Sequence, residues 1–326
     1  MTIKKITVLV LFLSFCFLHS SYSQKYSDVD RAVVKYPKHF NSTEDLAEKI
    51  QSDFSSDGDK ARAIYTWIAL NIKYDYASFL KPQRTQGFSY STEAEKQRKI
   101  KQINDKLIQN TFDSQKAVCE GFTALYQHLA GLVGLKSEII RGDSKTRLAD
   151  IGRKNTSSNH AWNTVLIDKR WRLIDVTWGQ GYYDSSKGRM VSDFDPVYFD
   201  TDQDYFFAKH FPDSGLYLGN KIDKNEFLNG PLIYNKTISG DHRIKSPDSG
   251  IIEAKYGDKI TIEIKNVSKS NVVFYLNKRN QPVKIQNSKE KRGGLEFQIT
   301  YDKNIGDYIT IYLDTFSIVS FKVIRK

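Results

Sequence analysis

The spacing of hydrophobic residues changes along this chain from a helical period to a strand period. Apolar residues recur at helical spacing in three runs, 42–54, 59–71 and 122–133, the last of which ends at Gly134. Strand-like runs follow at 136–141, 161–167 and 171–176. After a Gly230-Pro231 break, alternating runs continue at 259–265, 272–276, 295–301, 308–313 and 317–324. Helices before strands, followed by strands alone, predict an α+β core and then an all-β, sandwich-like domain.

The first 23 residues have the pattern of a secretory signal peptide. Lys4 and Lys5 precede an apolar stretch at 6–18, and a small-x-small sequence at 21–23 predicts cleavage before Gln24. No other run approaches the roughly 18 consecutive apolar residues of a membrane helix, so we expect no integral membrane segment after cleavage. The sequence therefore predicts a secreted or periplasmic protein.

Positive charges exceed negative ones, but they are dispersed. Lys and Arg total 49 against 38 Asp and Glu, a formal net charge of +11. The compact basic stripe with stacking aromatics that is typical of a nucleic-acid site is not found in the sequence. Neither are CxxC or HxxxH pairs, GxSxG or a Gly-rich phosphate loop. We therefore expect no nucleic-acid partner, no metal and no cofactor.

Cys119 is the only cysteine outside the predicted signal peptide. A lone cysteine forms no intramolecular disulfide, so it supplies no structural bridge to an exported chain. One interpretation is a small buried core residue. The other is a thiol nucleophile, because Cys119 stands at the first turn of a predicted helix, and a helix N-terminus favours the thiolate. A single His160 and a single Asp175 in the strand-like runs downstream favour the second interpretation, with imidazole as base and carboxylate as its partner.

The hairpin between the last two strand-like runs gives a geometric test of that pairing. If Asp168 and Lys169 form a two-residue turn, Ile167 pairs with Arg170, and His160 and Asp175 become diagonal neighbours on the same face. A three-residue turn would send the two side chains to opposite faces. An even turn is thus required for a Cys-His-Asp triad.

Four further residues adjoin these three in the sequence. Glu120 and Gly121 follow the cysteine, while Trp162 and Trp178 flank the histidine and the aspartate. We expect them to line a substrate cleft or to pack around it. An indole hydrogen bond to a reaction intermediate is the less favoured interpretation of the tryptophans.

Several motifs taken jointly resemble the transglutaminase-like superfamily. They are the segments 61–68 and 72–75, Val118-Cys119-Glu120-Gly121-Phe122, His160-Ala161-Trp162-Asn163 and the run 171–178. The resemblance covers about residues 40 to 220, and within it 198–200, 205–207 and His210-Phe211-Pro212 resemble the kyphoscoliosis peptidase branch. It implies a papain-like α+β core, with N-terminal helices and a nucleophile helix packed on an antiparallel sheet. It also implies a Cys-His-Asp triad at Cys119, His160 and Asp175. The expected division is then signal peptide 1–23, catalytic domain 24–228 and C-terminal β-sandwich domain 229–326.

Two departures from the family pattern bear on the reaction. Ala117 stands where many relatives have glycine, and no tryptophan aligns with the one that cross-linking members place upstream of the cysteine to bind the oxyanion. Trp67 belongs instead to a predicted helix.

A polar segment at 81–110 resembles an insertion beside the core.

The sequence therefore predicts an exported thiol-dependent acyl-transfer enzyme. The favoured reaction is hydrolysis of a peptide or amide bond through a thioester. Protein cross-linking by a transglutaminase and a non-catalytic binding or scaffold protein of the cell envelope stay open as alternatives. The expected partner is a protein or peptide substrate, with a cell-envelope component as one candidate.

Overall fold

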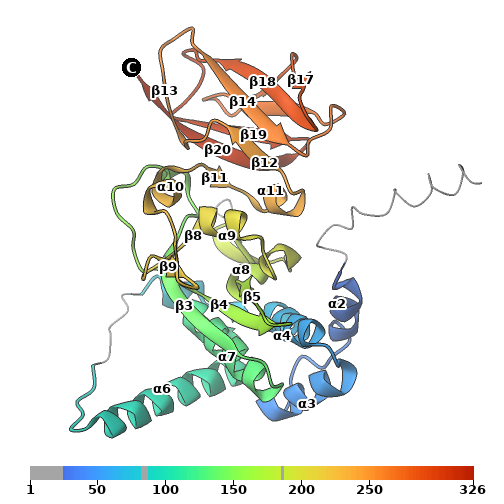
Figure 1. Ribbon diagram of the computed structural model, residues 1–326, viewed down its shortest axis with the longest axis vertical. Coiled ribbons are helices and arrows are strands. Elements are labelled where there is room, and N and C mark those ends of the chain that lie inside the picture. The colour runs from blue at the N-terminus through green and yellow to red at the C-terminus, as the bar shows by residue number, and fades with distance from the viewer. Residues whose placement is uncertain (1–24, 82–86, 185–186) are drawn as a thin grey trace, which may run out of the picture.

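Helices, a small antiparallel sheet and a β-rich region follow one another in space (Figure 1). The computed structural model describes residues 25–81, 87–184 and 187–326, so the expected signal peptide lies outside the described residues. Within those ranges, no helix has the length and apolar character needed to cross a membrane. The α+β class with a following β-rich region, predicted from the sequence, is confirmed.

The helices of the core begin at side-chain caps and bury one apolar face. Ser42 and Ser56 accept hydrogen bonds from the backbone of α3 and α4, as expected of N-cap residues. Residues Ala61 to Ala69 of α4 are buried, because this helix lies between its neighbours. Most of the predicted insertion forms helix α6. The buried residues of this helix, Ile108, Thr111 and Phe112, all lie near its C-terminal end. The bounds are α2 (Ser27–Val33), α3 (Thr43–Asp53), α4 (Asp57–Asn71), α5 (Tyr76–Phe79), α6 (Glu93–Ser114) and α7 (Cys119–Leu132).

Helix α7 starts at the cysteine and runs through the centre of the core. Short parallel strands β1 (Lys73–Tyr74) and β2 (Lys116–Ala117) lead into it. Phe122, Leu125 and Leu129 are completely buried. The helix ends before Gly134, whose φ of +84° suits glycine and closes the helix as the sequence predicts. Helix α7 thus carries Cys119 on a rigid, packed element.

The central sheet has the strand order β5-β4-β3-β8 with all pairs antiparallel. Ile167 pairs with Arg170 across a two-residue turn, Asp168 and Lys169, in which both residues have positive φ. Positive φ at both central residues is the type I′ geometry that matches strand twist, so the expected even register is the one adopted. The bounds are β3 (Ser137–Ser144), β4 (His160–Ile167), β5 (Arg170–Ile174) and β8 (His210–Pro212).

The strand predicted at 171–176 ends earlier than expected. Strand β5 stops at Ile174, and Val176–Gly179 form the short helix α8. Asp175 is the N-cap of that helix, because its Oδ1 accepts a hydrogen bond from the backbone N–H of Trp178 at 3.0 Å. The change of direction places Trp178 in a helical turn rather than beside a strand.

Shorter elements connect the central sheet to the β-rich region. They are β6 (Gly181–Asp184), β7 (Arg189–Ser192), α9 (Gln203–Lys209), β9 (Leu216–Tyr217), β10 (Asn220–Lys221) and α10 (Lys224–Asn229), with 3-10 turns at Leu148–Asp150 and Pro196–Tyr198. Residues 193–220 show little hydrophobic periodicity, and α9 and β8 lie in that stretch.

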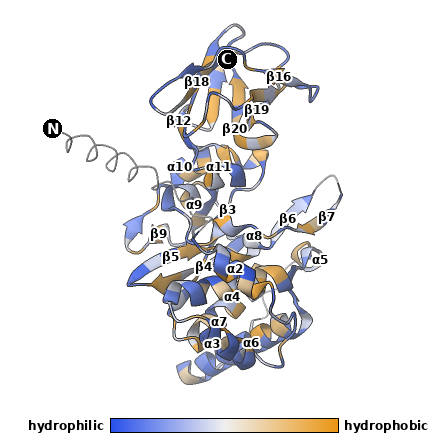
Figure 2. Ribbon diagram, turned by 90° about the vertical axis from the view of Figure 1, so that its right-hand side faces the viewer, coloured by the Kyte–Doolittle hydropathy of each residue, from blue (hydrophilic) through white to orange (hydrophobic). Residues whose placement is uncertain are grey.

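Two sheets enclose one apolar core in the β-rich region. One has the order β11-β20-β19-β15-β16, with β13 also paired to β20, and the other has the order β12-β14-β18-β17. Alternate residues of β14 and β19 are buried. Figure 2 shows hydrophobic residues in the strands near the labels β19 and β20. The bounds are β11 (Leu232–Ile233), α11 (Asn235–Ser239), β12 (Arg243–Ser246), β13 (Ile251–Ala254), β14 (Lys259–Lys265), β15 (Val273–Leu276), β16 (Pro282–Lys284), β17 (Lys289–Glu290), β18 (Gly294–Thr300), β19 (Tyr308–Leu313) and β20 (Phe316–Arg325). The division at 228/229 stays a prediction.

Buried polar contacts join the β-rich region to the core. Lys209 Nζ donates to the hydroxyl of Tyr198 at 3.0 Å and lies 3.5 Å from Oδ1 of Asn235 in α11. The Asn235 amide in turn donates to Asp195 at 2.6 Å. Lys145 Nζ donates to the carbonyl of Gly230 at 2.8 Å. These bonds hold the start of the β-rich region against the loops that follow the central sheet.

Candidate active site

Cys119 is the first residue of α7 and lies close to the central sheet. Its side chain is buried, and the thiol donates a hydrogen bond to Oε2 of Glu120 at 3.2 Å. The backbone N–H groups of Gly121 and Phe122 bond to the carbonyl of Val118. The N–H groups of residues 119 and 120 belong to the first turn, where a helix offers donors without intrahelical acceptors. The sulfur thus lies beside the positive end of the helix dipole.

His160 and Asp175 are in direct contact. His160 begins β4 and Asp175 follows β5, so the two adjacent strands present them at the same end of the sheet. Nε2 of His160 lies 2.7 Å from Oδ2 of Asp175, and both side chains are buried. The structure therefore brings together the two residues that the hairpin argument placed on one face.

The charge of Asp175 controls the protonation of His160. Burial alone disfavours a charged imidazole, but the carboxylate, its hydrogen bond and the thiol of Cys119 outweigh burial and raise the pKa of His160 to about 10. Burial likewise opposes ionisation of Asp175, yet the contacts with His160 and His210 hold the pKa of its carboxyl below the usual range. His160 is thus an imidazolium at neutral pH, paired with a carboxylate.

Cys119 lies near the same ring and is among the groups that raise the pKa of His160. Because Nε2 is occupied by Asp175, Nδ1 is the nitrogen left for the sulfur. The ring that contacts the carboxylate of Asp175 thus also lies near the sulfur. Nucleophilic thiol catalysis would require these three groups in this order.

The two tryptophans of the site have different positions. Trp178 stacks on the His160 ring, with centroids 5.2 Å apart and an interplanar angle of 17°. Trp162 is completely buried and packs with Leu173 and Phe206, and its ring is tilted by 36° to that of His160 with centroids 6.2 Å apart. Trp178 is therefore the tryptophan that stacks on the imidazolium, which favours the charged ring.

Glu120 and Gly121 also differ in what they contact. Glu120 is exposed and touches the thiol, so it lies at the mouth of the site. At Gly121, an added Cβ would lie 2.5 Å from both Ala117 Cβ and Thr111 Oγ1. Gly121 therefore allows α6 and α7 to approach closely and does not line a cleft.

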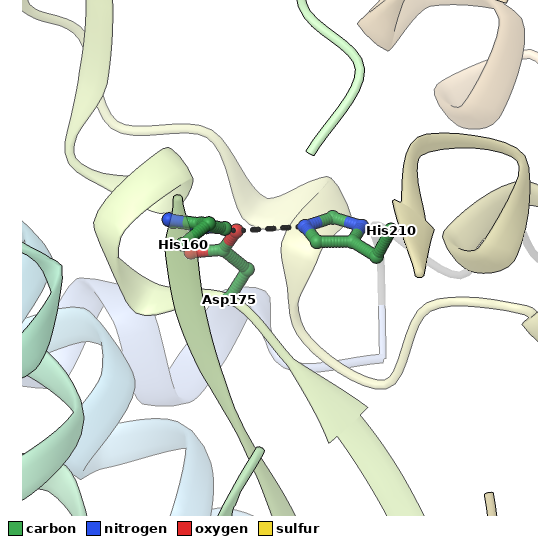
Figure 3. Close-up of side chains that lie close together, drawn as sticks. All are labelled: His160, Asp175 and His210. Atoms are coloured by element: carbon green, nitrogen blue, oxygen red, sulfur yellow. Dashed lines mark hydrogen bonds and ion pairs between the residues drawn. The ribbon is translucent and has the colours of Figure 1, made fainter. Parts of the chain in front are cut away.

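His210 is a member of the site that the sequence argument did not include. It begins β8, and its Nε2 lies 3.0 Å from Oδ2 of Asp175 (Figure 3). Burial and the charge of His160 lower the pKa of His210 to about 4, in spite of the carboxylate. His210 was noted only within the His-Phe-Pro motif, because nothing local in the sequence relates it to a residue 35 positions upstream.

In the described part of the chain, His160, Asp175 and His210 form the one group with metal-ligand spacing. Their ligand atoms lie within 4.8 Å of one another. The two N–O distances, 2.7 and 3.0 Å, are those of hydrogen bonds. A metal ion there would take the nitrogen with which His160 holds Asp175. The geometry fits a proton network better than a metal centre.

In this fold, a helix begins at a cysteine and packs on an antiparallel sheet that carries a histidine and an aspartate. This arrangement places the chain in the class of α+β proteins with a papain-like core. Residues 44–176 match the family model of the transglutaminase-like superfamily, and the chain is similar to members of that superfamily over this region. The family predicted from the sequence motifs is thus confirmed.

Two curated relatives are similar to the chain over most of its length. The human kyphoscoliosis peptidase is 27% identical over 247 residues, and the mouse kyphoscoliosis peptidase is 27% identical over 240 residues. Each match covers 72% of this chain but only 33% of the relative. The chain thus spans about one third of the length of these relatives.

Among solved structures, a TGase crystal structure matches with a TM-score of 0.30 and 23% identity. That match covers 55% of this chain and 44% of the other. A likeness of this strength adds nothing to the family assignment made from the sequence matches.

Proposed function

We propose that the chain is an exported thiol-dependent acyl-transfer enzyme that hydrolyses a peptide or amide bond through a thioester. The contact that carries the proposal is the 2.7 Å bond between His160 and Asp175, made by a ring whose pKa Cys119 also raises. Similarity to the superfamily supports the same chemistry, and the pattern of residues 1–23 supports export.

Each residue of the triad has one role in the proposed reaction. The Cys119 thiol first passes its proton to Nδ1 of His160, which gives a thiolate beside an imidazolium. The thiolate attacks the carbonyl carbon, a C–S bond forms, and the carbonyl electron pair moves to oxygen. Backbone N–H groups in the first turn of α7 stabilise that oxyanion. His160 gives its Nδ1 proton to the leaving amine as the C–N bond breaks.

Water completes the cycle. His160, now neutral, takes a proton from water, the hydroxide adds to the thioester, and the C–S bond breaks to release a carboxylic acid. Asp175 stays ionised and holds the ring, which is the role of the aspartate in such triads. Cys119 leaves as thiolate and His160 as imidazolium, so the starting ion pair is restored.

The position of Trp67 favours water over an amine as the acceptor. It is the only tryptophan upstream of Cys119. Its Nε1 donates to the carbonyl of Pro37 at 3.1 Å within the buried core. It is therefore not placed to bind an oxyanion, as the upstream tryptophan of cross-linking relatives does. The proposed substrate is a protein or peptide, with a component of the cell envelope as one candidate.

The test measures bond cleavage by the mature chain, residues 24–326. Denatured proteins are incubated with wild type, Cys119→Ala and His160→Ala, and new amino termini are counted by mass spectrometry. We expect cleavage by wild type alone and a loss of at least about 1,000-fold in both variants. His242→Ala is the matched control, because His242 bonds to Asn266 in the β-rich region.

A second arm adds a primary amine and a Gln-containing peptide. If the amine is incorporated and no new amino termini form, the activity is cross-linking and the proposed hydrolysis is wrong. If neither product forms, and Cys119 shows the same pH profile of alkylation by iodoacetamide in wild type and His160→Ala, the chain is a scaffold and the proposal fails.

A further inference from the structure

Asp175 is held by more partners than a triad needs. Oδ1 accepts the backbone N–H of Trp178 at 3.0 Å, and Oδ2 lies 2.7 Å from Nε2 of His160. Oδ2 also lies 3.0 Å from Nε2 of His210, and Figure 3 shows the ring of His210 directed at the Asp175 carboxylate. The carboxylate therefore has two imidazole neighbours, of which only one can serve the sulfur.

The ring of His210 is fixed on both faces. It stacks on Phe206 with centroids 4.0 Å apart and an interplanar angle of 14°, and Trp178 lies 4.3 Å away. Trp162 meets it edge-on at 5.0 Å. The side chain is completely buried. A ring packed in this way cannot turn away from Asp175 without displacing large aromatic residues.

The backbone also fixes His210 relative to His160. In β3, Gly142 pairs with His160 on one side and with Pro212 on the other, and Ser144 pairs with His210. An added Cβ at Gly142 would lie 2.1 Å from the carbonyl oxygen of Phe211. Strand β3 thus sets the separation of the two histidines, and a glycine is required for the close approach.

Hydrogen-bond accounting assigns the proton of His210. Nδ1 lies 3.0 Å from the carbonyl oxygen of Phe206, a neutral acceptor that also accepts the backbone N–H of His210. The carboxylate of Asp175 carries a full charge, and a bond to a charged acceptor is about twice as strong as one to a neutral acceptor. In the neutral ring, the proton is therefore on Nε2 and is donated to Asp175.

A neutral donor at this place differs from a cationic one in its effect on His160. A second imidazolium would compete for the negative charge that keeps His160 protonated. A neutral N–H fixes the direction of the carboxylate and leaves its charge to His160. Burial among aromatic side chains is what keeps His210 neutral.

We propose that His210 is a positioning residue, which donates its Nε2 proton to Oδ2 of Asp175 and keeps that carboxylate directed at His160. This inference rests on the proposed function, in which His160 and Asp175 serve Cys119. His210 itself touches neither the sulfur nor the substrate in this role.

Two amide variants test the role of the donor separately from that of packing. In His210→Gln the amide nitrogen reaches the position of Nε2, and in His210→Asn it reaches only that of Nδ1. We expect His210→Asn to lower kcat about 10- to 100-fold with little change in KM, as for a lost hydrogen bond to a charged group. We expect His210→Gln to stay within about threefold of wild type, since it keeps that bond. Equal losses in both variants would reduce the role of His210 to packing and overturn the proposal.

A readout independent of turnover separates this proposal from the proposed function. The Nε2 proton of His160 in its bond to Asp175 gives a low-field proton NMR resonance, which is measured in Cys119→Ala as well. His210→Asn should shift or broaden that resonance, and His210→Gln should restore it. An unchanged resonance in His210→Asn refutes the positioning role. A changed resonance in a chain without any turnover refutes the proposed function alone.

Discussion

Replacing Asp175 by Asn tests the origin of the charge on His160. The pKa of His160 is about 10, against an ordinary value of 6.5. This difference corresponds to a preference for the imidazolium of about 5 kcal/mol, at about 1.4 kcal/mol per pKa unit. Because burial opposes the charge and Asp175 supplies the largest favourable contribution, the variant should lose most of this preference. His160 then becomes neutral at pH 7.

The assay is the pH dependence of Cys119 alkylation by iodoacetamide. In wild type, His160 stays protonated from pH 6 to 8, so alkylation at pH 6 should be faster than in Asp175→Asn, in which the ring is neutral. In Asp175→Asn, the rate should rise roughly tenfold per pH unit below about pH 8, as for an ordinary thiol. Asp150→Asn is the matched control, because it also removes a buried carboxylate but one that bonds to Thr146 and Arg147.

The same variant should change the pH dependence of stability. The raised pKa of His160 contributes stability that is complete below pH 6.5 and is lost as the pH rises to about 10. The depressed pKa of Asp175 contributes stability above its ordinary 3.8 that is lost as the pH falls. The difference in unfolding free energy between wild type and Asp175→Asn should therefore be largest between pH 4 and 6.5. A flat alkylation profile in Asp175→Asn, or a stability difference independent of pH, would refute this reasoning.

Two further predictions concern packing around the site. Lys145→Met should stabilise the protein by about 2 kcal/mol at pH 7, because burial lowers the pKa of this amine from 10.5 to about 7 and only the lost bond to Gly230 offsets the gain. That gain in stability should shrink as the pH rises toward 10.5. Urea titrations would contradict the prediction if the difference in unfolding free energy between Lys145→Met and wild type did not vary with pH. Gly142→Ala should cost about 1–3 kcal/mol and slow peptide cleavage, because its Cβ would collide with Phe211. At Gly131 in α7, an added Cβ meets nothing within 4 Å, so Gly131→Ala should instead raise the unfolding free energy by up to about 1 kcal/mol. Equal effects of the two glycine substitutions on stability would refute this reasoning.

Local periodicity predicted the elements that bury one face along their whole length. Helices α3 and α7 and strands β14 and β19 lie within a few residues of their predicted bounds. The short strands β12, β13, β16 and β17 were missed, because segments of a few residues at a sheet edge carry too little alternation. Helix α8 was missed because one capping carboxylate, that of Asp175, ends the strand early.

The contacts of the site also differ in whether local sequence determines them. The contact of His160 with Asp175 was predictable, because the two lie on one hairpin whose turn length fixes the register. The contact of His210 with Asp175 was not, because it depends on the pairing of β8 with β3, which brings together segments more than 60 residues apart. Non-local strand pairing leaves no periodic signal in the sequence.

The buried ammonium of Lys209 links the surroundings of the site to the β-rich region. Its oxygen partners include Asn235, which lies on the far side of the expected boundary at 228/229, and its positive charge lies 4.9 Å above the ring of Trp178. A fragment that stopped before α11 would expose this cation next to the indole that covers His160. Engineering that grafts another β module onto the core would thus have to reproduce an amide at the place of Asn235.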